Sequence, residues 1–380
     1  MVILAGSEAR HMTEEADLMT DERNYGIDLL KIISMFMVSL MHVLGQGGLF
    51  SQYEHGSGNF VVAQVLLGLS FCAVNCFAMA TGYICTDRRF RYARILPLWL
   101  TTVFYGIVIT GLFAIIDPSF VDRGIWQKSL LPVCSRTYWY FTAYFLLFFL
   151  MPMLNKAYDG MTREESKRLL LILFVLLSVV TTFLRSSETM PDPFVMVDGA
   201  HPFWLVYMYL IGSHIKRHVN VRKNTRLKAM LLFLACTAAM ALSGIYMEQS
   251  PFYVYTSPTV VIQAACLVVF LADSGFDPGP NVGSVLRLMS TLSFSVYLFQ
   301  LHPIVWNEIL KDKFVSYASL SPAMTVLFSV GIAMLLYLGA SAADLIRFAL
   351  FRMLRITELS NALFLALGID KKKRREPRTF

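Results

Sequence analysis

Charged residues are scarce in this chain of 380 residues. Only 16% are Asp, Glu, Lys or Arg, against about 25% in an average soluble domain, and 56% are hydrophobic. Apolar segments recur from residue 26 to residue 345 with short polar gaps between them. This pattern excludes a soluble enzyme and predicts one continuous membrane domain rather than two or three soluble domains.

Cysteine is also rare, and its placement argues against a disulfide framework or a metal knuckle. Of the six cysteines, five lie inside or at the ends of apolar segments, and Cys134 falls in a predicted external loop. His214 and His218 have the H-x3-H spacing of a metal site, but no Glu follows the first and Lys216 and Arg217 lie beside them. The sequence therefore predicts no bound metal.

A basic face with interleaved stacking aromatics is missing as well. The net charge is +7, but the 33 Lys and Arg residues lie in clusters between the apolar segments. We therefore expect no nucleic acid partner. Lys and Arg residues in short loops of membrane proteins lie mostly on the cytoplasmic side. An N-terminus inside the cell places most of the basic residues of this chain on that side, so we expect this orientation.

The apolar segments predict an all-α, polytopic membrane protein. A membrane-spanning helix needs about 20 mostly apolar residues, and by this rule the chain has about ten such helices. They are expected at residues 26–46, 60–84, 95–116, 138–154, 168–184, 201–215, 228–247, 252–272, 286–309 and 322–345. An even number of spans predicts a multi-pass protein of the cell membrane, in contact with lipid, with both termini in the cytoplasm.

The two ends of the chain differ from the membrane domain at residues 26–345. Residues 1–25 are predicted to form a polar cytoplasmic lead-in. Residues 346–380 alternate basic and apolar residues and include the run KKKRR, which predicts an interfacial helix with a tail that binds anionic lipid. An ordinary stop-transfer charge cluster is the alternative interpretation of this run.

The first predicted helix carries polar residues that a lipid-facing helix would not carry. Asp28, Lys31 and His42 interrupt its apolar run, and near the bilayer centre each costs up to ~2.5–3.5 kcal/mol on insertion scales. At helical spacing they share one face, with Lys31 near the cytoplasmic end and His42 about 16.5 Å further along. Asp28 is too far from His42 for a direct bond, so we expect it to pair with Lys31. A packing role is the alternative for His42.

Four arginines precede the third predicted helix: Arg88, Arg89, Arg91 and Arg94. Membrane topology alone explains a few positive charges here, but the run is denser than topology needs. Arg91 and Arg94 are one helical turn apart, a spacing at which two guanidinium groups can bind phosphate bidentately.

Four features of the sequence belong together: Lys31 and His42 in K-x10-H spacing, Arg91 and Arg94 in R-x-x-R spacing, the stretch NCFAMATGYI and the stretch TLSFSVYLFQLHPIVW. Over about residues 26–345 the chain resembles the acyltransferase-3 family of integral-membrane acyltransferases. The resemblance implies a ten-helix core, cytoplasmic acyl-coenzyme A as donor, an essential His42 and the arginine pair near the donor. The family more often has Arg where Lys31 stands, and Lys lacks the planar fork for bidentate binding.

Three further residues are candidates for the acceptor side. His302 is expected at about the depth of His42, or it is an ordinary histidine at a helix end. Trp139 and Tyr140 begin the fourth predicted helix, where they line a sugar-binding mouth or belong to an aromatic belt.

We therefore expect an O-acetyltransferase that moves an acyl group from acyl-coenzyme A, most simply acetyl-coenzyme A, to a hydroxyl of a cell-envelope glycan or similar acceptor. In this interpretation His42 is the general base, Lys31 and Asp28 support it, and the four arginines bind the donor. A small-molecule or proton-coupled transporter is the main alternative, because buried His and Asp also serve as proton relays. A non-catalytic membrane scaffold is the third.

Overall fold

The computed structural model describes residues 23–185, 192–247, 250–272 and 275–370. This part of the chain consists of helices joined by turns and loops, without a strand, so the all-α prediction is confirmed. The predicted lead-in up to residue 22 and the run KKKRR lie outside the described residues.

The α-helices differ widely in length. They are α2 (Tyr25–Leu44), α3 (Gly58–Ser70), α4 (Ala73–Cys85), α5 (Ile95–Ile116), α6 (Arg123–Leu130), α7 (Trp139–Asp159), α8 (Arg163–Phe174), α9 (Thr181–Arg185), α10 (Pro202–His218), α11 (Lys223–Tyr246), α12 (Pro258–Leu271), α13 (Gly279–Gln300), α14 (Pro322–Met353) and α15 (Ile356–Ala366).

Within the described residues, seven helical segments are long and apolar enough to cross a membrane. They are 25–44, 58–85, 92–116, 163–184, 223–246, 279–300 and 322–353. The other three predicted spans form α7, α10 and α12. The last two have 17 and 14 residues, and 14 residues rise only about 21 Å against a hydrocarbon core of about 30 Å. The prediction of about ten spans is therefore not confirmed.

Helix α14 continues past the predicted end at residue 345. An ion pair lies inside this extension: Arg347 Nε and Nη2 donate to the two carboxylate oxygens of Asp344 at 2.6 and 2.7 Å. Tyr105 from α5 donates a further hydrogen bond to the same carboxylate at 2.9 Å. These two charges thus satisfy each other within the protein.

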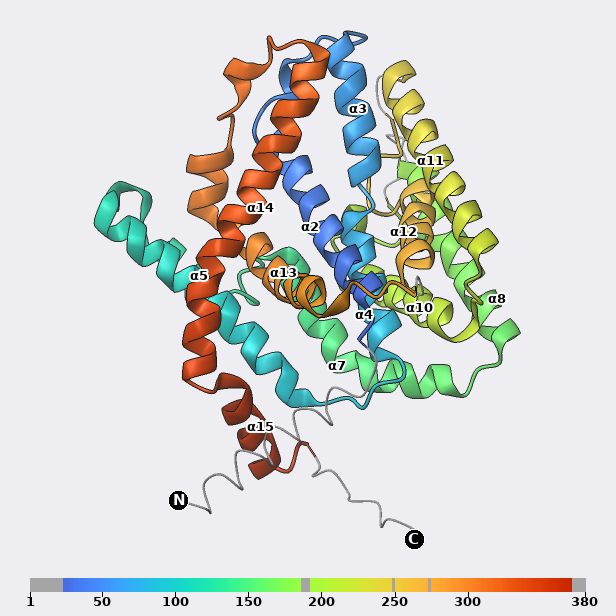
Figure 1. Ribbon diagram of the computed structural model, residues 1–380, viewed down its shortest axis with the longest axis vertical. Helices are drawn as coiled ribbons and strands as arrows, with labels where there is room; N and C mark the ends of the chain where they lie inside the picture. Colours follow the sequence, from blue (N-terminus) through green and yellow to red (C-terminus); the bar gives the residue numbers. More distant parts are fainter. Residues whose placement is uncertain (1–22, 186–191, 248–249, 273–274, 371–380) are drawn as a thin grey trace.

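Helix α2 lies in the middle of the bundle. It packs against α3, α4, α12, α13 and α14, and Figure 1 shows α14 and α5 on one side of it and α3, α11 and α12 on the other. We call the end of the bundle where α2 begins, α4 ends and α5 begins the basic end. The opposite end, where α2 ends and α3 begins, is the histidine end.

Helices α4 and α10 cross in direct backbone contact. A Cβ atom at Gly82 would meet the backbone of Tyr209, and one at Gly212 would meet the backbone of Met79. Small residues allow helices to approach this closely in membrane proteins. The crossing brings the C-terminal ends of the two helices together at the basic end.

Candidate active site

His42 is held from α13 by a buried amide. Its Nδ1 atom lies 2.8 Å from Oε1 of Gln300, the last residue of α13. Gln300 Nε2 donates to Ser39 Oγ at 2.7 Å, and Ser39 Oγ donates to the carbonyl oxygen of Met35 at 3.1 Å. Gln300 and Ser39 are fully buried, whereas His42 is only partly buried. Sequence reasoning missed Gln300, although a glutamine inside an apolar helix was a signal for it.

This chain of hydrogen bonds determines the tautomer of His42. The single hydroxyl proton of Ser39 is used on Met35, so Ser39 must accept from the amide nitrogen of Gln300. The amide oxygen then faces His42, and Nδ1 must carry the ring proton. Nε2 is left with a lone pair, which is the form that a general base requires.

Trp306 packs against the same imidazole. The two ring centroids are 4.9 Å apart and the rings are nearly perpendicular, at 86°. Trp306 belongs to a short π-helix, η6 (Val305–Leu310), and its carbonyl oxygen accepts from Gln46 Nε2 at 3.1 Å. The turn after α2 therefore holds the segment after α13, and π-helices are frequent at functional sites. Trp306 was also missed as a site residue.

Asp28 has a different partner from the one expected. Arg23 donates to its two carboxylate oxygens at 2.6 and 3.1 Å, and Ser290 from α13 donates at 2.8 Å. Within the described residues, no hydrogen bond or ion pair joins Asp28 to Lys31, although the two are close enough to interact electrostatically. Asp28 therefore anchors the start of α2, about 21 Å along the helix from His42.

Lys31 faces a group of basic residues at the basic end. Lys31, Arg88 and Arg94 all lie close enough to the Cys85 thiol to act on it electrostatically. Arg94 is exposed at the start of α5, and Arg91 is partly buried. The fold thus brings the lysine of the K-x10-H motif towards the arginine-rich loop.

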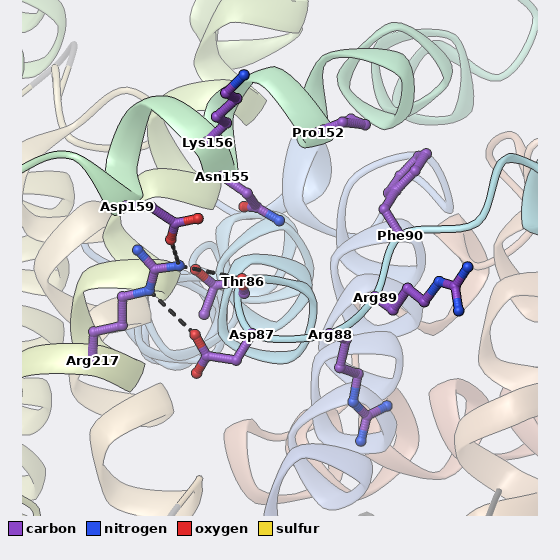
Figure 2. Close-up of a pocket in the computed structure, with 10 residues that line it drawn as sticks. All are labelled: Thr86, Asp87, Arg88, Arg89, Phe90, Pro152, Asn155, Lys156, Asp159 and Arg217. Carbon is purple, nitrogen blue, oxygen red and sulfur yellow. Dashed lines mark hydrogen bonds and ion pairs between the residues drawn. The ribbon is translucent and has the colours of Figure 1, made fainter. Parts of the chain in front are cut away.

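A pocket of about 510 Å³ opens at the basic end. It is lined by Thr86, Asp87, Arg88, Arg89, Phe90, Pro152, Asn155, Lys156, Asp159 and Arg217. Two of the four predicted donor-binding arginines are in this set, whereas Arg91 and Arg94 are not. Figure 2 shows Arg88, Arg89 and Lys156 spread around the pocket, with Phe90 on the same side as Arg89. Lys156 and Arg217 come from α7 and α10, and no local sequence pattern connects them with the arginine loop.

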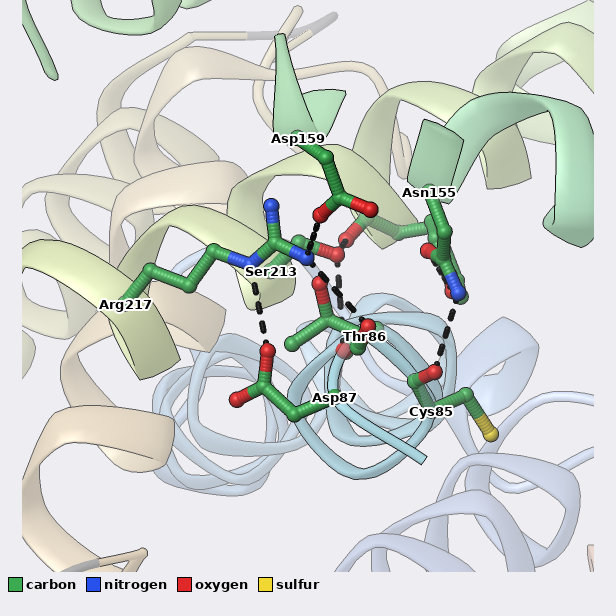
Figure 3. A network of polar contacts seen from close by, with 9 residues as sticks. Cys85, Thr86, Asp87, Asn155, Asp159, Ser213 and Arg217 are labelled. Carbon is green, nitrogen blue, oxygen red and sulfur yellow. Dashed lines mark hydrogen bonds and ion pairs between the residues drawn. The ribbon is translucent and has the colours of Figure 1, made fainter. Parts of the chain in front are cut away.

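Arg217 binds the ends of three helices together at this pocket (Figure 3). It contacts Asp159 at 2.5 Å, Asp87 at 3.3 Å and the carbonyl oxygen of Thr86 at 3.3 Å. Nearby, Asn155 Nδ2 donates to the carbonyl oxygen of Cys85 at 3.0 Å. With four basic and two acidic side chains among its lining residues, the pocket keeps an excess of positive charge.

His302 is placed in the interior of the protein. It is 1% exposed; its Nδ1 accepts from the backbone N–H of Ile304 at 3.3 Å, and its Nε2 lies 3.2 Å from Thr110 Oγ1. Thr110 in turn bonds Ser129 of α6 at 2.8 Å. Both ring nitrogens are thus used within the protein, in a network that ties the end of α13 to α5 and α6.

The two aromatic candidates lie at the start of α7. Trp139 stacks on Tyr255, with centroids 5.9 Å apart, and Tyr140 packs edge-to-face on Tyr297 at 6.2 Å. The backbone N–H of Tyr140 also donates to Tyr297 Oη at 3.1 Å, so the start of α7 contacts α13 three residues before Gln300. Among the described residues, no group of three or more His, Cys, Asp or Glu side chains is placed to hold a metal ion.

Comparison with known families gives one match. The model of the acyltransferase-3 family, described as an acyltransferase domain, matches residues 24–340, a range that includes His42, the arginine loop and Gln300. No curated protein and no solved structure matches the chain.

The ion pair of Asp28 leads to a stability prediction. Arg23→Ala leaves a buried carboxylate with Ser290 as its remaining hydrogen-bond donor, and we expect a loss of about 1–3 kcal/mol, reduced by the partial exposure of Arg23. Thermal unfolding of the detergent-purified protein, followed by tryptophan fluorescence, measures it. Lys31→Met is the matched control. A larger drop in Tm for Lys31→Met than for Arg23→Ala would show that Lys31 is the true partner of Asp28.

Proposed function

The chain belongs to the acyltransferase-3 family, and from this premise we propose that it transfers an acetyl group from coenzyme A to a hydroxyl of a cell-envelope glycan or a similar acceptor. The family match confirms the resemblance and makes the chain a membrane acyltransferase. The observation that carries the finer proposal is the contact of His42 Nδ1 with Gln300 Oε1, from which we infer a Nε2 lone pair at a partly exposed position.

In the proposed reaction His42 is the general base. Nε2 takes the proton of the acceptor hydroxyl while its oxygen attacks the thioester carbonyl carbon, forming the new ester bond as the carbon–sulfur bond breaks. The proton on the imidazolium then passes to the leaving thiolate, which restores His42 and releases coenzyme A. Gln300 Oε1 keeps its hydrogen bond to Nδ1 throughout, so the ring holds its orientation in both protonation states.

The donor is proposed to bind at the basic end. Phosphate groups favour charge-assisted hydrogen bonds from Arg and Lys, and the pocket offers Arg88, Arg89 and Lys156 together with the aromatic ring of Phe90. Lys31 and Arg94 both lie near the Cys85 thiol, at the end of α4 from which this pocket begins. We propose that the pantetheine arm passes Lys31 and covers the distance of about 16.5 Å along α2 to His42.

The acceptor is proposed to approach from the histidine end. Trp306 forms one wall beside the imidazole, and Tyr140 contacts Tyr297, three residues before Gln300 in α13. This arrangement allows the acetyl group to reach the acceptor while attached to coenzyme A, without crossing lipid as a free species. With the basic end in the cytoplasm, as the positive-inside bias indicates, the acceptor is on the outer side.

The first functional prediction concerns His42. His42→Ala should lower acetyl transfer about 10²–10⁴-fold, because the general base is lost while the apolar helices are unchanged. The assay incubates purified protein and cell-wall fractions with radiolabelled acetyl-coenzyme A. His55→Ala, an exposed histidine in the loop before α3, is the control and should keep wild-type activity. Uptake of label by vesicles without covalent transfer would instead support the transporter.

The second concerns the orientation of the ring. Gln300→Leu removes the acceptor for Nδ1–H, and we expect a kcat lower by about 10–100-fold with little change in KM for either substrate. Gln300→Glu keeps an acceptor oxygen at this position and should retain more activity than the leucine variant. Equal kcat values for wild type and Gln300→Leu would contradict the assigned role.

The third concerns the donor pocket. Lys156→Ala should weaken binding of acetyl-coenzyme A about tenfold, and the effect should shrink as salt is added, because the site is open to solvent. Calorimetric titration of the purified variants gives the affinities, with the α6 variant Lys128→Ala as the matched control. Unchanged affinity in the triple variant Arg88→Ala, Arg89→Ala, Lys156→Ala would remove the donor from this pocket.

A further inference from the structure

The last described segment of the chain holds the backbone of the R-x-x-R motif. Helix α15 packs against a short 3-10 helix, η2 (Tyr92–Arg94), and against the start of α5. The carboxylate of Asp370 accepts the backbone N–H of Tyr92 and that of Ala93, each at 2.9 Å. Ser360 Oγ in α15 donates to the carbonyl oxygen of Ala93 at 2.7 Å. Tyr92 and Ala93 are the two residues between the arginines of the motif.

These peptide groups need partners from elsewhere in the fold. The first N–H groups of a helix have no acceptor within it, and neither Arg91 nor Arg94 provides a side-chain cap for the helix that follows it. Ala93, Ser360 and Asp370 are all buried, so a missing bond here would leave a polar group away from water. A carboxylate at this position also interacts favourably with the helix dipole. The segment around Asp370 therefore fixes the turn between the two arginines.

The carboxylate does this without using the guanidinium groups. Within the described residues, no ion pair joins Asp370 to Arg91 or to Arg94. Arg94 remains exposed and near the Cys85 thiol. The turn is fixed by backbone bonds, while the positive charge of the motif stays available to an anionic ligand.

We propose that Asp370 and Ser360 are positioning residues for the donor site. By holding the backbone at Tyr92 and Ala93, they set the direction in which Arg91 and Arg94 leave the chain directly after Phe90 of the proposed donor pocket, so that both charges lie at the edge of the site for acyl-coenzyme A. The C-terminal helix α15 is then part of the donor-binding apparatus, rather than only a lipid-surface helix. This inference rests on the proposed function, in which acyl-coenzyme A binds at the basic end.

The test compares Asp370→Ala with Glu358→Ala, which removes an exposed carboxylate from the same C-terminal region. Two measurements are made on the full-length purified protein: hydrogen exchange of the amides at residues 91–95, and KM and kcat with acetyl-coenzyme A as the varied substrate. For Asp370→Ala we expect faster exchange at Tyr92 and Ala93 and a donor KM raised about tenfold, with kcat within about twofold of wild type. Asp370→Asn keeps one acceptor oxygen, so its exchange rate and its donor KM should lie between those of the wild type and those of Asp370→Ala.

Faster exchange with an unchanged donor KM would overturn the inference, and so would unchanged exchange. If Asp370→Ala does not fold, Ser360→Ala removes the bond to the carbonyl of Ala93 alone and is judged by the same two measurements. A wild-type protein that neither binds nor uses acetyl-coenzyme A would refute the proposed function itself. A wild type that uses this donor, together with an Asp370→Ala variant of equal donor KM, would refute the positioning role alone.

Discussion

The contact between α2 and α13 provides hydrogen-bond partners for three polar side chains of α2, namely Asp28, Ser39 and His42. In hydrocarbon such groups are costly unless the protein itself provides their partners. Ser290 of α13 donates to Asp28 at one end of α2, and Gln300 bonds Ser39 and His42 at the other. The two helices therefore have one register in which all these bonds form, and that register sets where the imidazole of His42 points.

Along the contact between α2 and α13, the charged side chains lie at one end and His42, the proposed general base, lies at the other. Asp28, bound by Arg23, lies at the basic end with Lys31 and the arginine loop, whereas a neutral amide accompanies His42. A basic surface suits the phosphates of a nucleotide donor, and the neutral amide beside His42 accepts from Nδ1 and leaves Nε2 for the acceptor. The proposed reaction uses this division: the donor is bound at one end and its thioester reacts near the other.

Much of this arrangement was predictable from local sequence, and the remainder depended on tertiary contacts. Polar residues in an apolar helix identified His42 and Lys31, and dense spacing identified the arginine loop, because these signals lie within one segment. Gln300, Trp306, Lys156 and Arg217 reach their partners across the fold, and no single segment shows such pairings. Asp28 was assigned to Lys31 because it is too far from His42, but in the fold Arg23 binds its carboxylate. The count of about ten spans is not confirmed, since α10 and α12 have only 17 and 14 residues and are packed among other helices.

The central claim is that Gln300 acts on the reaction through His42. A double-mutant cycle tests it most directly, with the rate of acetyl transfer measured for wild type, Gln300→Leu, His42→Ala and the double variant. The account predicts that Gln300→Leu changes the residual rate of the His42→Ala protein by less than about twofold, because the ring that it orients is gone. Losses that multiply in the double variant would contradict the claim and assign Gln300 a role independent of the histidine.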